Sequence, residues 1–122
     1  MEIAVRKIQE TYIIDIGGEV DMYNAHRLKE VVATMVQKQV CIFILNLKKV
    51  TYVDSSGIGA LLSINASLAR EGMAFRIVNV PRPVMRVIEL TKLVGFLPIL
   101  ANELEAIESV VGKRPRRSAN AT

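Results

Sequence analysis

The sequence predicts a single α/β domain, in which a mixed β-sheet of about five strands has about four helices packed mainly on one side. Short β-branched and aliphatic runs alternate with longer segments whose apolar residues recur at helical spacing. The length of 122 residues suits one compact domain. Hydrophobic residues make up 51% of the chain but aromatic residues only 5%, so aliphatic side chains must pack the core, as in a sheet flanked by helices.

The N-terminal segment predicts a β-hairpin followed by a helix. Apolar residues roughly alternate with polar ones over residues 3–8, residues 12–16 are rich in β-formers, and the turn falls at residues 9–11. Gly17 and Gly18 end the second strand, and Asp21 is expected to be the N-cap of the helix. The predicted buried face of this helix consists of Ala25, Leu28, Val32, Met35 and Val36.

The middle of the chain predicts a buried strand and a long helix. Residues 41–47 form the best candidate for the central strand, in which Cys41 is expected to be a buried free thiol. Residues 50–53 lead into a helix that begins near Asp54–Ser55 and runs to about Arg70. Gly72 provides a plausible end to this helix.

The C-terminal part predicts two strands and two shorter helices. A strand over residues 75–80 precedes a helix over residues 84–90, whose first turn is favoured by Pro83. A short strand over residues 96–100 contains Pro98 and should therefore lie at a sheet edge. Asn102 is expected to cap a last helix, and the folded domain is expected to span residues 1–111.

Charge and cysteine content limit the function classes. Four of the sixteen basic residues lie in residues 112–122, a predicted disordered tail, so twelve basic and twelve acidic residues remain in the folded body. A neutral body gives no support for direct nucleic-acid binding. One cysteine and no apolar run of membrane-spanning length favour a cytoplasmic protein, expected to be a monomer or weak dimer. No metal cluster or acid–base pair emerges, so we expect no cofactor, no metal and no enzymatic activity.

The block Asp54-Ser55-Ser56-Gly57-Ile58-Gly59 allows three interpretations. It lacks the glycine and lysine spacing of a phosphate-binding loop. It also lacks the glycine that a nucleophile elbow needs two positions before its serine, and the single histidine, His26, falls on a helix surface. The third interpretation is a serine displayed at a helix N-terminus as a covalent acceptor, against the simpler alternative that Asp54 or Ser55 only caps the helix.

The predicted helix behind this block favours the acceptor. Its core face is expected to hold Ile58, Leu61, Leu62 and Ala69. A solvated face would normally be rich in Lys and Glu, whereas small side chains allow another surface to approach closely. The opposite face is expected to show Gly59, Ala60, Ser63, Ser67 and Arg70.

Four further features of the sequence belong together: Gly18-Glu19-Val20-Asp21, Leu45-Asn46-Leu47, the segment from Val50 to Gly59, and the segment from Val84 to Leu93 with Phe96. Through them the sequence resembles the anti-sigma-factor antagonists, members of the STAS domain class, from Glu2 to Ile107. In one respect it differs, because Lys92 stands where the family usually has glycine and Gly95 follows three residues later.

The resemblance implies a STAS-like fold and phosphorylation of Ser55. The implied kinase is an anti-sigma factor that is itself a serine kinase, and a metal-dependent serine phosphatase reverses the modification. The unphosphorylated protein then binds the kinase and frees its sigma factor. A phosphate on Ser55 would lie over the helix N-terminus and add about −1.5 to −2 charges beside nearby acids, excluding the partner. The expected partner-binding residues are Glu19, Asp21, Asp54, Ser56, Gly57, Gly59, Ala60, Ser63 and Ser67.

Two other functions remain open for such a domain. It could be a STAS scaffold or transporter-accessory domain in which Ser55 is only a cap, or a STAS sensor that holds a nucleotide or lipid. The intact Asp54-Ser55-Ser56-Gly57 block favours the switch over both.

Overall fold

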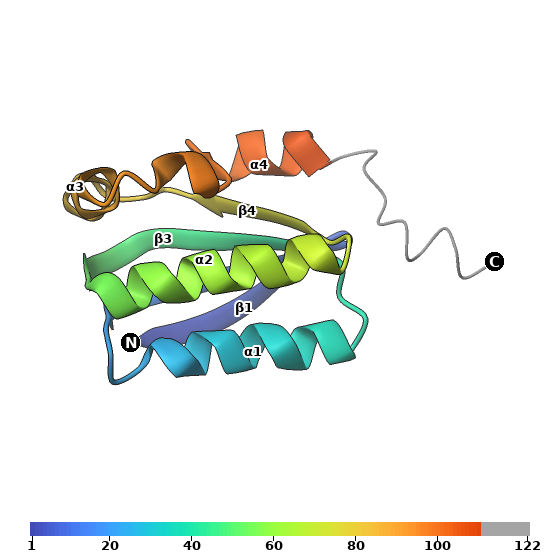
Figure 1. Cartoon of the computed structure of the whole chain (residues 1–122). Helices are drawn as coiled ribbons and strands as arrows, with labels where there is room; N and C mark the ends of the chain where they lie inside the picture. Colours follow the sequence, from blue (N-terminus) through green and yellow to red (C-terminus); the bar gives the residue numbers. More distant parts are fainter. Residues whose placement is uncertain (111–122) are drawn as a thin grey trace.

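The computed structural model describes residues 1–110, which form one five-stranded mixed sheet with four α-helices (Figure 1). The strand order is β1-β2-β3-β4-β5; β1 is antiparallel to β2, and the other neighbours are parallel. This confirms the predicted fold class and the initial hairpin. The elements in chain order are β1 Glu2–Ile8, β2 Thr11–Val20, α1 Ala25–Gln37, β3 Ile42–Val53, α2 Ser55–Arg70, β4 Ala74–Val78, α3 Arg82–Leu90, the 3-10 turn η1 Val94–Phe96, β5 Ile99–Leu100 and α4 Glu103–Val110.

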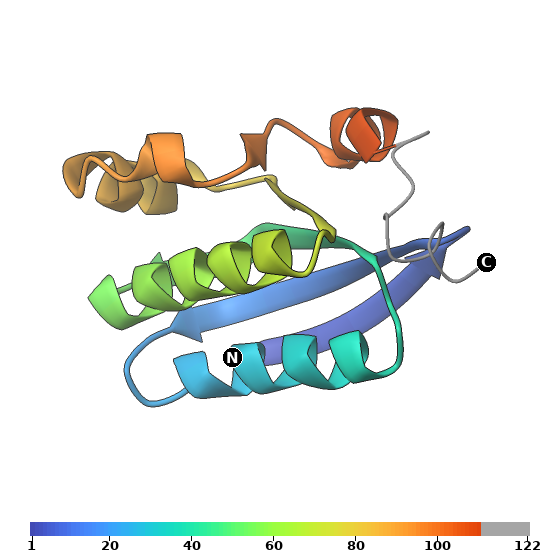
Figure 2. The same ribbon diagram turned by 45° about the vertical axis from the view of Figure 1, so that its right-hand side comes forward.

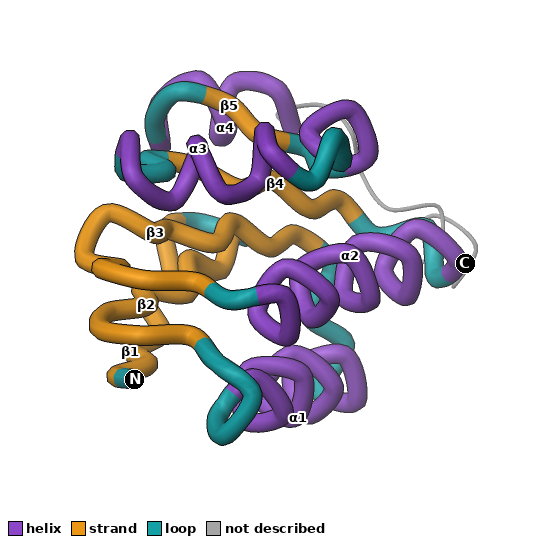
Figure 3. The backbone as a smooth tube through the Cα atoms, turned by 60° about the vertical axis from the view of Figure 1, so that its left-hand side comes forward, coloured by secondary structure: helices purple, strands orange, loops and turns teal. Residues whose placement is uncertain are grey.

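The two faces of the sheet carry two unequal apolar clusters. Side chains alternate along each strand, so Ile14 and Phe43 point to the larger core under α1, α2 and α3. Their neighbours Ile13 and Ile44 point to the opposite face, where Ala106 of α4 is buried against them. Figures 2 and 3 show α1 and α2 lying side by side over the larger core. The prediction of helices mainly on one side is confirmed, with α4 alone covering the other face.

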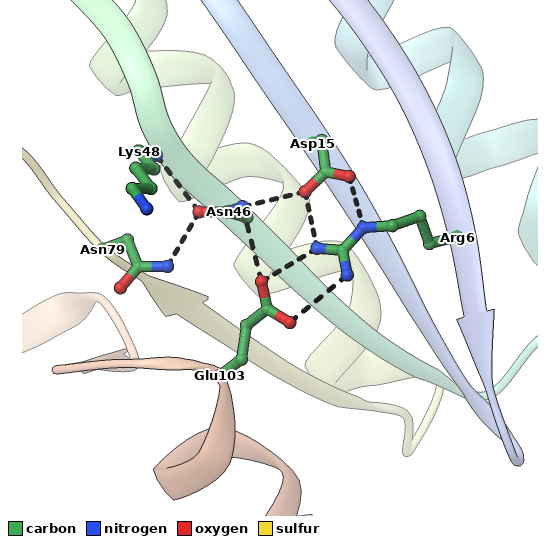
Figure 4. Close-up of polar contacts among 6 residues, drawn as sticks. All are labelled: Arg6, Asp15, Asn46, Lys48, Asn79 and Glu103. Atoms are coloured by element: carbon green, nitrogen blue, oxygen red, sulfur yellow. Dashed lines mark hydrogen bonds and ion pairs between the residues drawn. The ribbon is translucent and has the colours of Figure 1, made fainter.

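A polar cluster ties α4 to three strands (Figure 4). The Arg6 guanidinium donates to Asp15, with 2.5 Å from Nε to Oδ2, and to Glu103 of α4, with 2.8 Å from Nη2 to Oε2. Asn46 of β3 donates to Asp15 Oδ1 at 2.8 Å. The hydrogen bonds from Arg6 lower the pKa of Asp15, because they favour its ionised form. These contacts fix α4 on a face where few apolar side chains are available.

Several local predictions are confirmed. Helix α2 covers Ser55–Arg70, and Gly72 follows it with a φ of +72°, the left-handed conformation that glycine adopts without strain. Asn102 Oδ1 accepts the Glu105 N–H at 2.9 Å, as expected of a cap for α4. The predicted tail and the domain boundary at residue 111 lie outside the described residues. None of the helices within residues 1–110 has the length and apolar character needed to cross a bilayer.

Four local predictions are wrong. Gly17 and Gly18 do not end β2, which continues to Val20 with shifts in its register against β3. Asp21 does not cap α1: its Oδ1 accepts the Tyr23 N–H at 2.9 Å, and a turn intervenes before the helix begins at Ala25. Cys41 is half-buried before β3, because the strand starts one residue later and the thiol lies 3.3 Å from the Gln39 carbonyl oxygen. Phe96 lies in η1 and is 66% exposed, so only Ile99–Leu100 pair at the edge.

The turn after α3 places Lys92 in the left-handed region, with a φ of +62°. A side chain in this region costs about 1–2 kcal/mol, whereas the greater freedom of glycine in the unfolded chain costs about 0.5–1 kcal/mol. We therefore expect Lys92→Gly to raise the free energy of unfolding in urea by about 0.5–1 kcal/mol. The control Glu89→Gly, within α3, should lower the same free energy by about 1 kcal/mol. A loss of stability in Lys92→Gly would show that the lysine side chain stabilises the turn.

Candidate functional site

The candidate site lies where the carboxyl ends of the parallel strands β2 and β3 meet. Each strand leads into a helix, so the loop of residues 21–24 before α1 lies beside the start of α2. The Asp54 N–H donates to the Val20 carbonyl oxygen at 3.2 Å and joins the two segments at their base. In open α/β sheets this edge is where the strand ends leave room for ligands and partners.

Asp54 is the N-cap of α2 and also contacts the neighbouring loop. Its backbone is extended, with φ of −99° and ψ of −174°, and its Oδ1 accepts the Gly57 N–H at 3.0 Å. Its second oxygen, Oδ2, accepts the Met22 N–H at 3.0 Å. One carboxylate therefore caps the helix and links it to the loop of residues 21–24.

Ser55 is the first residue of α2 and is exposed. Among the described residues, no hydrogen bond engages its hydroxyl group. Because Asp54 supplies the capping oxygen, the Ser55 hydroxyl is not needed to cap the helix. The backbone N–H groups of the first helical turn and the positive end of the helix dipole lie beside it, an environment that tolerates a bound phosphoryl group.

Gly57 allows α2 to lie close to the strand ends. A Cβ atom at this position would be 2.7 Å from the Val20 carbonyl oxygen and 2.7 Å from Val53 Cγ1. Gly57, one of the expected partner contacts, is itself buried. Its role is in packing: it lets the start of the helix approach the sheet and so fixes where Ser55 is presented.

The exposed face of α2 differs in part from the predicted one. Gly59, Ser63 and Ser67 are exposed, as expected, and so is Arg70. Ala60 is only 4% exposed and faces the core, so the prediction that it lies on the exposed face is wrong. The predicted core residue Ala69 is exposed and Leu62 is half-buried, whereas the core contacts come from Ile58, Leu61, Ile64 and Leu68. The helix still presents small residues to solvent, namely Ser56, Gly59, Ser63, Ala66, Ser67 and Ala69.

The other expected partner contacts lie across the strand ends from α2. Glu19 is exposed at the end of β2, and Asp21 is half-buried in the following loop. Residues 19–24 and 54–59 together contain three carboxylates and no lysine or arginine. The site therefore presents negative charge even before any modification, and a phosphoryl group would add to it.

The sequence reasoning missed Met22 and Tyr23. The structure exposes 65% of Met22 and 79% of Tyr23, in the loop that Asp54 contacts. Large exposed apolar side chains in a loop are typical of surfaces that bind a partner. The sequence feature that could have identified them is the pair of adjacent large residues between Asp21 and Asn24, in a segment otherwise made of turn-forming residues.

The fold and the site together define a single α/β domain that displays two adjacent exposed serines, Ser55 and Ser56, at a capped helix N-terminus. Within residues 1–110, no group of three or more His, Cys, Asp or Glu side chains is placed to hold a metal. The STAS domain family model matches residues 2–106, and the chain belongs to this family.

Curated relatives and solved structures agree with this assignment. The chain is 32% identical over 88 residues to an anti-sigma-B factor antagonist of Staphylococcus aureus, covering 72% of this chain and 82% of that protein. It is 26% identical over 108 residues to an anti-sigma F factor antagonist of Paenibacillus polymyxa, covering 88% and 92%. A Thermotoga maritima protein assigned as an anti-sigma factor antagonist has a crystal structure with a TM-score of 0.81 and 28% identity, covering 88% and 93%.

Proposed function

We propose that this protein is an anti-sigma factor antagonist whose binding to an anti-sigma serine kinase is controlled by phosphorylation of Ser55. The observation that carries the proposal is that Asp54, and not Ser55, caps α2, so the exposed Ser55 hydroxyl is left free. The curated relatives support the same class of function. The protein acts here as a binding partner and as a kinase substrate, with no catalytic role of its own.

The unphosphorylated surface suits a close protein contact. The small side chains on α2 allow a partner backbone to approach, and the neutral Ser55 hydroxyl can be buried at low cost. A phosphoryl group in the same place is a bulky, hydrated anion next to Asp54, so the contact is lost. Binding of the kinase frees its sigma factor, and a metal-dependent phosphatase restores the binding form. Because these partners act in the bacterial cytoplasm, we expect the protein to act there too.

The test of this proposal is phosphorylation by the cognate kinase with ATP. We expect a gain of one phosphate, located at Ser55 by mass spectrometry, because the hydroxyl is exposed and the family resemblance assigns the modification to the serine directly after Asp54. Ser55→Ala should abolish the gain and keep kinase binding. The matched control Ser56→Ala, which removes the adjacent exposed hydroxyl, should be phosphorylated at the wild-type rate. Labelling that survives in Ser55→Ala, or that maps to Ser56, would refute the assignment of Ser55. The absence of any labelling would indicate a scaffold or a ligand-sensing STAS domain instead.

A further inference from the structure

We infer that the protein forms a two-fold symmetric dimer through the outer edge of β1, which pairs antiparallel with β1 of a second copy and continues the sheet. The inference is independent of the proposed function, because it uses neither Ser55 nor the loop of residues 21–24. It names the occupant of an apolar groove beside β1, and it gives the register in which the two copies meet.

The two edges of the described sheet differ in length and in protection. Figure 3 shows β1 and β5 at opposite ends of the sheet. The strand β5 has only two residues and follows Pro98, so it offers little to another strand. The strand β1 has seven residues and no proline, and it pairs with β2 without a register shift. A long edge without a bulge or a proline is a template for a further strand.

The hairpin determines which backbone groups of β1 point outward. Its two-residue turn makes Ile8 and Thr11 a pair that exchanges both backbone hydrogen bonds, and such pairs alternate along an antiparallel ladder. The even-numbered residues of β1 therefore bond to β2. Ile3, Val5 and Lys7 turn their N–H and C=O groups to the open edge, where no strand within residues 1–110 pairs with them.

An apolar groove of about 760 Å³ lies beside this edge, between β1 and α1, and its lining includes Ile3, Val5, Val31 and Met35. Val5 is 47% exposed, although Ile14, its partner on β2, is fully buried in the larger core. An added strand covers a surface of this kind, because it satisfies the backbone groups of the edge and places alternate side chains on the apolar floor.

The sequence of β1 is complementary to itself in one antiparallel register. An axis between two residues would set outward-facing backbone groups against inward-facing ones, so the two-fold axis must pass through a residue. With the axis at Ala4, Ile3 of each copy lies opposite Val5 of the other, and Glu2 lies opposite Arg6. The first pair extends the apolar floor of the groove across the dimer, and the second joins opposite charges on the other face of the sheet.

Moving the axis to the next outward-facing residue on either side removes the ion pair. With the axis at Val5, Glu2 lies opposite Ile8, and with the axis at Ile3, Glu2 lies opposite Ala4. Apolar and charged residues are thus matched together only when the axis passes through Ala4. This self-complementarity identifies the occupant of the edge as a second copy of the chain.

Arg6 is held in place for the contact between the copies. Its guanidinium already bonds to Asp15 and Glu103 of its own copy, and its side chain remains 42% exposed. These four bonds leave one N–H of Nη1 free, since a guanidinium has five N–H donors. The free N–H can be donated to Glu2 of the other copy.

The first test is disulfide formation across the axis, in a Cys41→Ser background that removes the native thiol. Ala4→Cys places two thiols in a pair whose Cα atoms lie about 4.5 Å apart, so mild oxidation should convert most of the protein into a covalent dimer on a non-reducing gel. Ile8→Cys is the matched control, because it is exposed on the same face of β1 but has no residue opposite it in this register. It should remain a single chain.

Two outcomes of this test would overturn the inference. A covalent dimer of Val5→Cys without one of Ala4→Cys would show that the axis passes through Val5 and that the register is wrong. The absence of a covalent dimer in both variants would show that the two β1 edges do not meet.

Sedimentation equilibrium tests the same interface without a covalent bond. The average mass of the wild type should rise with concentration toward that of two chains. Glu2→Lys should raise the Kd of the dimer by about tenfold, because it sets like charges opposite each other at Arg6. Glu10→Lys, the same charge change in the exposed turn after β1, should leave the Kd unchanged. A wild type that stays a single chain up to millimolar concentration would refute the dimer, and would leave the role of Ser55 unaffected.

Discussion

Gly57→Ala is expected to lower the free energy of unfolding by about 1–3 kcal/mol, whereas Gly59→Ala is expected to raise it by about 0.5–1 kcal/mol. The two glycines lie two residues apart in the same helix, so a general preference of the helix for alanine predicts the same sign for both. At Gly57, a methyl group would meet the Val20 carbonyl oxygen and Val53 Cγ1 at 2.7 Å. At Gly59, nothing lies within 4 Å of the added atom.

Urea unfolding of the three proteins at one temperature measures both changes. The Val20 carbonyl oxygen belongs to the backbone at the end of β2, so it cannot move aside without shifting the strand. Relief of the clash must therefore move the start of α2, and with it Ser55 and the Asp54 contacts to Gly57 and Met22. A stability gain in Gly57→Ala similar to that in Gly59→Ala would show that the helix can be displaced at little cost.

The sequence was sufficient to predict most of the fold because most elements have strong local signals. The hairpin, the buried strand before Asp54 and the limits of α2 depend on apolar periodicity together with turn and cap residues. The start of α1 could not be predicted in this way. Asp21 and Asn24 are both good capping residues, and the hydrogen bonds of their side chains within the turn decide that the helix begins only at Ala25.

The main error at the site was the predicted rotation of α2 about its own axis, which determines which residues face the core. Nearly every residue of this helix is apolar or small, so several faces are equally suited to burial. Packing in the folded domain buries Ala60, Ile64 and Leu68 in the core and leaves Ala69 in solvent. The burial of Gly57 and the two contacts of the Asp54 carboxylate depend on the distance between β2 and α2, which no local pattern reports.

The observed rotation of α2 determines which residues are exposed, and therefore which substitution can test the docking surface. Ala60→Arg would place a charged side chain in the core, where Ala60 is 4% exposed, and would weaken binding by unfolding the protein. Ser63 lies one turn from Gly59 on the exposed face, so Ser63→Arg adds bulk and charge without disturbing the core. We expect its free energy of unfolding to stay within about 0.5 kcal/mol of the wild type.

Ser63→Arg should raise the Kd for the anti-sigma kinase by about 100-fold, because a surface fitted to small side chains cannot accommodate the arginine. Isothermal titration calorimetry with the unphosphorylated protein measures the change. Leu104→Arg is the matched control: it adds the same charge at an exposed position of α4, on the other face of the sheet, and should bind like the wild type. Since the charge is equal in both variants, a difference between them locates the interface on α2. Wild-type affinity in a folded Ser63→Arg would exclude this part of α2 from the contact and leave the loop of residues 21–24 and the first turn of α2 as the docking surface.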